Sequence, residues 1–177
     1  TTLVSAPAGA GGTSLAVGLL AEASRAGHWC AAVGLADPGV AAMAELGLDL
    51  RRAVFVPRPQ AGWAEAAAEL LEGVELLLLR PPPRVPHAAA RRLVARAKDR
   101  RCALVVLGAS RAAWPLPPDL ELEIERARWE GAGEGEGRLA RRLVEVRIEA
   151  RGVPTARRAR LWLPSEQGDV AALTKGT

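Results

Sequence analysis

The sequence is poor in the residues that build disulfide frameworks and metal sites. It has two cysteines and two histidines in 177 residues. Cys30 and Cys102 lie far apart in separate apolar segments, which excludes a disulfide-stapled fold and a zinc site of closely spaced ligands. We expect both to be buried, reduced thiols, as free cysteines usually are, and we expect no bound metal.

Aromatic residues and lysine are also scarce. There is no tyrosine, and there is one phenylalanine beside five tryptophans. Arginines without interleaved aromatic side chains lack the stacking surface that single-stranded nucleic acid uses. The only lysines are Lys98 and Lys175, so arginine carries nearly all of the positive charge. The net charge of +4 permits contact with nucleic acid but does not by itself indicate it.

Long hydrophobic runs are missing. No apolar segment approaches the roughly 20 residues that a membrane-spanning helix needs, and no signal peptide is visible. The chain opens directly in a strand-like segment, Thr1-Thr2-Leu3-Val4, which leaves room for a natural N-terminal region ahead of it. With 49% hydrophobic and 25% charged residues, the composition is typical of a globular domain, and we expect a cytoplasmic protein without membrane contact.

The first part of the chain alternates short apolar segments with helix-forming segments. This alternation is typical of an α/β domain with a largely parallel sheet. We expect strands at 2–5, 29–35, 54–56, 74–79 and 103–107. We expect helices at 13–26, 40–46, 63–72 and 86–101.

The pattern changes after residue 119. Apolar and charged residues then alternate with period two, which predicts antiparallel strands with one solvent-facing side at 120–129, 143–151 and 158–163. A glycine-rich stretch at 130–137 predicts a flexible hairpin tip. The expected organisation is one domain over 1–164 and a polar, flexible C-terminal tail over 165–177.

A glycine-rich loop lies between the first strand and the first helix, where a phosphate-binding loop would lie. Residues 5–14 read SAPAGAGGTS. A phosphate loop needs backbone N–H groups, a lysine for the phosphates and a hydroxyl for Mg²⁺. Gly11 and Thr13 keep a glycine and the hydroxyl, but Gly12 stands at the lysine position. We therefore expect Gly9, Gly11 and Gly12 to serve a tight turn and to bind no cofactor, with weak phosphate binding at the helix N-terminus as the alternative.

Two longer stretches resemble RecA. Residues 36–71 contain a Leu-Gly-Leu-Asp-Leu turn followed by a short strand, a proline-rich turn and a helix, at a spacing similar to that in RecA. Residues 143–152, LVEVRIEARG, resemble a RecA strand of the extension. The resemblance covers 1–164 and implies an α/β fold: a RecA-like P-loop core with a mostly parallel central sheet, extended by C-terminal antiparallel strands.

The residues that perform ATP hydrolysis in RecA are not matched. The strand VELLLLR ends in Arg80, where the family has an aspartate for Mg²⁺. A positive charge there repels the metal by roughly 4 kcal/mol per pair of unit charges about 4 Å apart. The position of the catalytic glutamate falls on Leu35, or on Asp37 if a small gap is allowed. We therefore expect no ATPase activity and no catalytic residue.

The RecA loops that contact DNA are matched only by short, proline-rich segments, 81–86 and 108–118. A RecA core without the ATP chemistry and these loops is similar to the ImuA group, particularly the actinobacterial ImuA′ proteins. The resemblance implies a catalytically inactive accessory or scaffold of the damage-induced (SOS) translesion synthesis complex. Its partners would be an ImuB-type Y-family-like adaptor and, through it, an error-prone C-family DNA polymerase, at the nucleoid when DNA is damaged. A nucleotide-responsive P-loop switch and a SulA-like division inhibitor are the alternatives.

The resemblance also implies where a partner would bind. In RecA a neighbouring subunit docks along the stretch that matches 53–70, which makes Val54, Val56 and Trp63 candidate contacts. Trp114, on the short loop after the fifth strand, is a second candidate anchor. The alternative for both tryptophans is packing inside the protein.

Five arginines are candidates for contact with DNA phosphates: Arg91, Arg92, Arg96, Arg141 and Arg142. The alternative is that they are solvated charges, because glutamates alternate with arginines along the expected strands.

Overall fold

The computed structural model describes residues 1–37, 39–132 and 137–173. Within them, nine strands form one sheet in the order β3-β2-β4-β5-β1-β6-β7-β8-β9. The first strands are β1 (Thr2–Ser5), β2 (Cys30–Val33), β3 (Ala53–Val56), β4 (Leu76–Leu79) and β5 (Ala103–Gly108). The helices are α1 (Gly12–Arg25), α2 (Val40–Glu45), α3 (Trp63–Leu70) and α4 (His87–Asp99). The last strands are β6 (Leu120–Ala132), β7 (Gly137–Ala150), β8 (Arg157–Trp162) and β9 (Ala171–Ala172).

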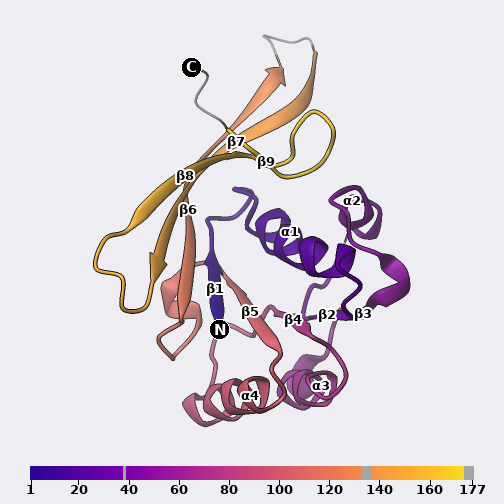
Figure 1. Cartoon of the computed structure of the whole chain (residues 1–177), viewed down its shortest axis with the longest axis vertical. Coiled ribbons are helices and arrows are strands. Elements are labelled where there is room, and N and C mark those ends of the chain that lie inside the picture. The colour runs from indigo at the N-terminus through magenta and orange to yellow at the C-terminus, as the bar shows by residue number, and fades with distance from the viewer. Residues whose placement is uncertain (38, 133–136, 174–177) are drawn as a thin grey trace.

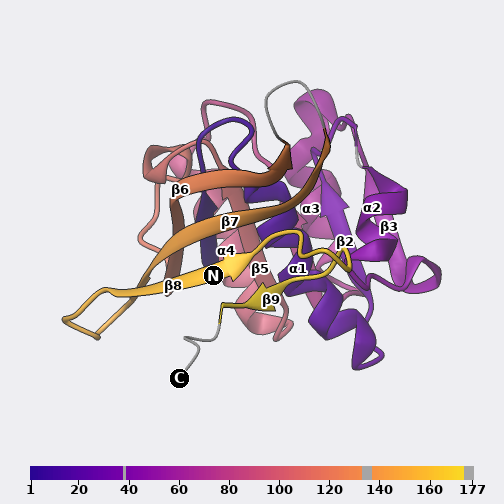
Figure 2. The same cartoon turned by 90° about the horizontal axis from the view of Figure 1, so that it is seen from above.

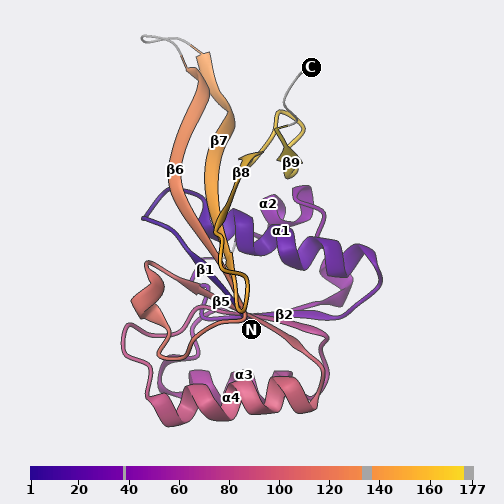
Figure 3. The ribbon, with the colours of Figure 1, turned by 60° about the vertical axis from the view of Figure 1, so that its left-hand side comes forward.

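From β3 across the sheet to β6, that is in the order β3-β2-β4-β5-β1-β6, each strand is parallel to the next. Helices α1 and α2 cover one face, and α3 and α4 cover the other (Figure 3). All four residues of β2 and of β4 are buried, because helices cover the sheet on both sides. The expected alternation of strands and helices is confirmed, as a mixed α/β fold whose sheet is mostly parallel.

The four C-terminal strands, β6 to β9, pair antiparallel and extend the sheet beyond the helical layers (Figure 1). Seen from above, β6, β7 and β8 lie side by side (Figure 2). One face of the extension packs on α1 through Leu122, Ile124, Val144 and Val146. The period-two pattern therefore predicted the correct buried face.

The β6–β7 hairpin is longer than expected. Pairing continues past the predicted strand ends, with Trp129 opposite Arg142 and Glu130 opposite Arg141. Residues 133–136 of the expected hairpin tip lie outside the described residues.

The segment after Pro164, expected to be a flexible tail, contains strand β9, which pairs with β8. Val170 packs against the core on the α1 side, where a β-carbon at Gly18 would lie 2.9 Å from Val170 Cγ2. The small residue at position 18 thus leaves room for Val170. Residues 174–177 of the expected tail lie outside the described residues.

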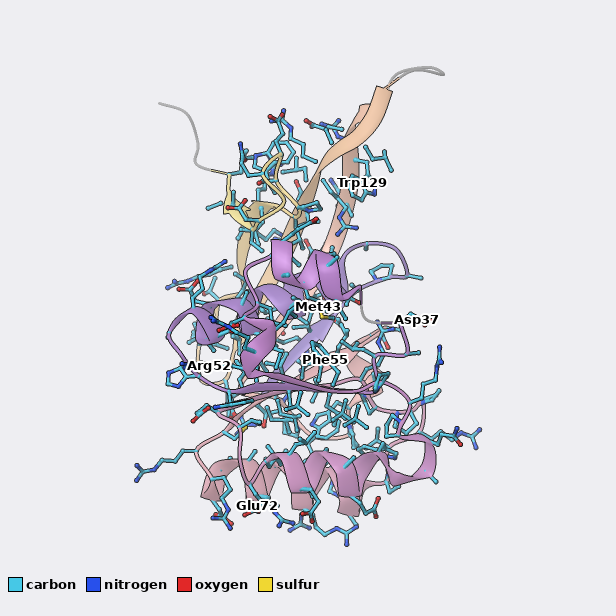
Figure 4. The ribbon with its side chains drawn as sticks, turned by 90° about the vertical axis from the view of Figure 1, so that its right-hand side faces the viewer. Asp37, Met43, Arg52, Phe55, Glu72 and Trp129 are labelled. Atoms are coloured by element: carbon cyan, nitrogen blue, oxygen red, sulfur yellow. The ribbon has the colours of Figure 1, made fainter. Side chains whose placement is uncertain are left out.

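Two apolar cores lie on the two faces of the sheet. Met43 belongs to the core beneath α1 and α2, and Phe55 packs against it (Figure 4). The expected strand at 29–35 begins one residue too early, because Trp29 precedes β2 and is 46% exposed. Among the described helices, none combines the length and the apolar character needed to cross a bilayer.

Candidate functional site

A cavity of about 840 Å³ lies at the carboxyl ends of β1, β5 and β4. Three loops line it: the glycine loop after β1, the segment 80–83 after β4, and the segment 107–113 at the end of β5. Arg142 reaches the same cavity from β7. Open parallel sheets bind ligands at the carboxyl ends of their strands, and this volume is in the usual range of ligand pockets.

The glycine loop turns tightly into α1. Gly11 caps the helix with φ of 101°, a left-handed conformation that L side chains rarely adopt. Gly12 is buried, and a β-carbon there would lie 2.8 Å from the β-carbon of Ala6. The first turn of α1 has no capping side chain and no acidic residue. Among the described residues, no acceptor is found for the backbone N–H groups of 11–14.

Arg142 is the most enclosed charge of the cavity, with 6% of its surface exposed. Its Nε donates to the carbonyl oxygen of Leu163 at 2.7 Å, Nη1 to that of Gly9 at 3.1 Å, and Nη2 to Ser14 Oγ at 3.3 Å. Burial lowers the pKa of the guanidinium, which stays protonated because arginine starts so high. Within the described residues it forms no ion pair, and the ring of Trp129 lies 4.8 Å from its central carbon.

Arg80 lies on the other side of the cavity, directly after β4. Its side chain is exposed, and Nη2 donates to Thr13 Oγ1 at 3.3 Å. The hydroxyl that would contact Mg²⁺ in a phosphate loop is therefore beside a guanidinium.

No carboxylate lines the cavity within the described residues. Leu35 is buried in the core, and Asp37 pairs at the surface with Arg58 at 2.9 Å (Figure 4). Across the described chain, no cluster of three or more His, Cys, Asp or Glu residues could hold a metal. The arrangement can attract an anion, and its described lining has no carboxylate, imidazole or thiol that could bind a metal or act as a general base.

The candidate partner contacts divide into two groups. Strand β3 lies at one edge of the sheet, and its outer side has no partner strand in the described part of the chain. Val54 and Val56 lie on it, half-buried against the core beneath α3 and α4. Trp63 and Trp114 are only 8% and 4% exposed and belong to that core, so neither presents its indole to a docking partner.

The five candidate DNA contacts also separate. Arg142 is buried beside the glycine loop and does not lie on an exposed strand face. Arg96 pairs with Glu72 at 2.6 Å. Arg141 pairs with Glu130 at 3.1 Å and lies 4.1 Å from the ring of Trp162. Arg91 and Arg92 are exposed on α4 without an ion pair to any described residue.

Sequence reasoning did not assign Arg142 to the cavity, although a signal was present. In an antiparallel strand every second residue faces the same side. Val144 and Val146 face α1, so Arg142 faces the same way and meets the glycine loop. The signal is a charged residue at a position where the alternation of the strand places buried side chains; it could have identified Arg142.

Comparison with known proteins places the α/β part in a family. Residues 3–115 match the family described as MT3502 N-terminal domain. The chain is similar to the uncharacterized protein Rv3395c of Mycobacterium tuberculosis (strain ATCC 25618 / H37Rv), with 39% identity over 97 residues. The matched stretch covers 54% of this chain and 48% of that relative, so the chain aligns with about half of the relative's length.

Proposed function

This chain belongs to the MT3502 N-terminal domain family. We propose, on the resemblance and on the site geometry, that it is a catalytically inactive, RecA-like accessory protein that acts by binding other proteins. The proposed setting is the damage-induced translesion synthesis complex, in the cytoplasm and at the nucleoid, with an ImuB-type adaptor as partner. One observation carries the inactive part of this proposal: the cavity at the glycine loop is lined by two arginines and, among the described residues, by no carboxylate.

Phosphoryl transfer depends on Mg²⁺ and on a residue that orients the attacking nucleophile. In the cavity, Arg80 donates to the Thr13 hydroxyl, the group that would contact Mg²⁺. Asp37, the candidate for the catalytic carboxylate, lies in a surface ion pair and not in the cavity. A guanidinium can bind phosphate oxygens, but it neither coordinates Mg²⁺ nor accepts a proton from water. The cavity therefore supports binding without hydrolysis.

The RecA-like part of the proposal is supported by the order of elements. A short strand, β1, leads through the glycine loop into α1, and alternating helices and parallel strands follow. Antiparallel strands, β6 to β8, then extend the sheet. This is the order that the resemblance implied.

The free edge of β3 is where we place the adaptor. The backbone groups on this edge pair with no other described strand, so they can take up an extended segment of a partner as an additional strand. Leu50, which begins the single helical turn before β3, is 40% exposed and offers an apolar contact near this edge. The identity of the adaptor follows from the resemblance, and the edge supplies a surface for it.

Co-expression with an ImuB-type adaptor tests the proposal. We expect the two proteins to co-purify and the complex to show no ATP hydrolysis above background with Mg²⁺. Leu50→Glu should weaken the complex about ten-fold, because it places a charge in an apolar contact. Val153→Glu is the matched control, since Val153 is 49% exposed at the distant β7–β8 turn. Recovery of the cell-division polymer instead of the adaptor would replace this proposal with the SulA-like alternative.

A further inference from the structure

The cavity at the glycine loop concentrates positive charge without a counter-charge. Arg80 and Arg142 are the only charged residues among its described lining. They approach from different elements, β4 and β7, and both donate to hydroxyls of the first turn of α1. The positive end of the helix dipole and the guanidinium groups therefore act on the same space.

The burial of Arg142 also points to a ligand, independently of the helix N-terminus. Only 6% of Arg142 is exposed, yet it has no carboxylate partner among the described residues. Three neutral oxygens accept from it, whereas a guanidinium has five N–H donors. A buried charge without an opposite charge is unfavourable, and an anion in the adjoining cavity would supply one.

The backbone supplies further donors. Gly11, Gly12, Thr13 and Ser14 all line the cavity, and no acceptor from the described chain is found for their N–H groups. α1 is 14 residues long, so its N-terminus carries a full helix dipole. N–H groups at such a terminus bind the oxygens of phosphate groups.

The geometry points to a metal-independent site for a phosphate-bearing anion in this cavity. The α1 N–H groups and Thr13 Oγ1 hold the phosphate oxygens, Arg80 donates to them from the β4 side, and Arg142 provides the buried counter-charge. Donors converge on the space from the helix, from β4 and from β7, which suits a tetrahedral group with several oxygens better than a planar carboxylate. This inference goes beyond the proposed function and does not depend on which protein is the partner.

The size and the other walls define the ligand class further. A volume of about 840 Å³ exceeds the space of a single phosphate. The remaining walls are largely apolar, from Pro81, Pro82, Ala112 and Ala113, and the described lining contains no aromatic ring to stack on a base. The site therefore fits a pyrophosphate group, either free or as part of a nucleotide, without selecting the base. The terminal phosphate of a nucleic-acid strand presents the same chemistry.

Titration calorimetry of the full chain in EDTA tests the site, with pyrophosphate as the first probe. We expect binding without Mg²⁺, and we expect Arg80→Gln to weaken it roughly ten-fold or more, because one charged hydrogen-bond donor is lost. Arg84→Gln is the matched control: Arg84 is exposed on the same proline-rich segment and does not line the cavity. Arg142→Lys, which keeps the charge and shortens the donor, should also weaken binding.

Binding measurements with other ligands distinguish the possible sources of the phosphate group. ATP and GTP that bind alike, without Mg²⁺ and with the same sensitivity to Arg80→Gln, support a nucleotide source. An oligonucleotide that binds only when it carries a 5′-phosphate supports a nucleic-acid end. The inference is overturned if millimolar pyrophosphate gives neither heat nor a rise in melting temperature, if binding requires Mg²⁺, or if Arg80→Gln and Arg84→Gln behave alike.

Discussion

The guanidinium of Arg142 on β7 donates a hydrogen bond to the carbonyl oxygen of Gly9, with 3.1 Å between Nη1 and that oxygen, across 133 positions of the chain. The same side chain donates to Leu163 and Ser14, so one residue connects β7, the end of β8 and the glycine loop. The antiparallel extension therefore helps to hold the loop that forms the cavity wall.

Replacement of Arg142 by methionine should lower the free energy of unfolding by about 2 kcal/mol, because two backbone carbonyls and a hydroxyl lose their donor. Urea denaturation followed by tryptophan fluorescence measures the change. Arg141→Met is the control, since Arg141 makes partly exposed ion pairs and should cost no more than about 1 kcal/mol. Equal losses for the two variants would contradict a special role of Arg142.

Two glycines of the loop should respond differently to alanine. A β-carbon at Gly11 would lie 2.3 Å from Arg142 Nη2, whereas a β-carbon at Gly9 meets nothing within 4 Å. Both residues have positive φ, so each substitution carries a backbone cost of about 1 kcal/mol. Gly11→Ala should be the more destabilising variant and should also displace the Arg142 side chain.

The comparison is made by chemical denaturation of both variants under the same conditions. The result that would overturn the described loop geometry is a Gly9→Ala variant that loses as much stability as Gly11→Ala.

The sequence allowed the α/β part and the antiparallel extension to be predicted because both depend on local patterns. The apolar run of β4 and the period-two alternation around Val144 and Val146 are each contained in a few neighbouring residues. The site depends on contacts between distant segments: the period-two register shows which way Arg142 faces, but not that it meets Gly9, 133 positions away. Trp63 and Trp114 show the same limit: their burial arises from the layer that α3 and α4 form together.

Stability should depend on pH through Glu121, which is 6% exposed on β6. Burial raises the pKa of its carboxyl above 4.5, and Arg111, at 3.0 Å, opposes this only in part. Because the folded pKa lies above the unfolded one, the stabilising contribution of the protonated form is present at low pH and is lost as the pH rises through the folded pKa. Glu121→Gln should therefore be at least as stable as the native chain at pH 7, with the difference vanishing below about pH 4.5.

Glu72 provides a control of opposite sign for that measurement. The hydrogen bond from Arg96, together with Arg100, holds the pKa of its carboxyl below 4.5. Its contribution is therefore present above the unfolded pKa and is lost as the pH falls through the folded pKa. Glu72→Gln should be less stable than the native chain at neutral pH and equally stable in acid. If the urea midpoints of the two variants, relative to the native chain, change with pH in the same direction, at least one of the two assignments is contradicted.

The two cysteines should be unreactive in the folded protein. Cys30 and Cys102 are buried, and burial raises the pKa of each thiol from 9.0 to about 11. The thiolate is the reactive form, so a rise of this size lowers its population roughly 100-fold near pH 8, before access is considered. A disulfide-exchange reagent such as dithionitrobenzoate should therefore titrate almost no thiol in buffer and both thiols in urea. The single variants Cys30→Ser and Cys102→Ser assign any residual reaction, and rapid reaction of either thiol under native conditions would show that the core opens around it.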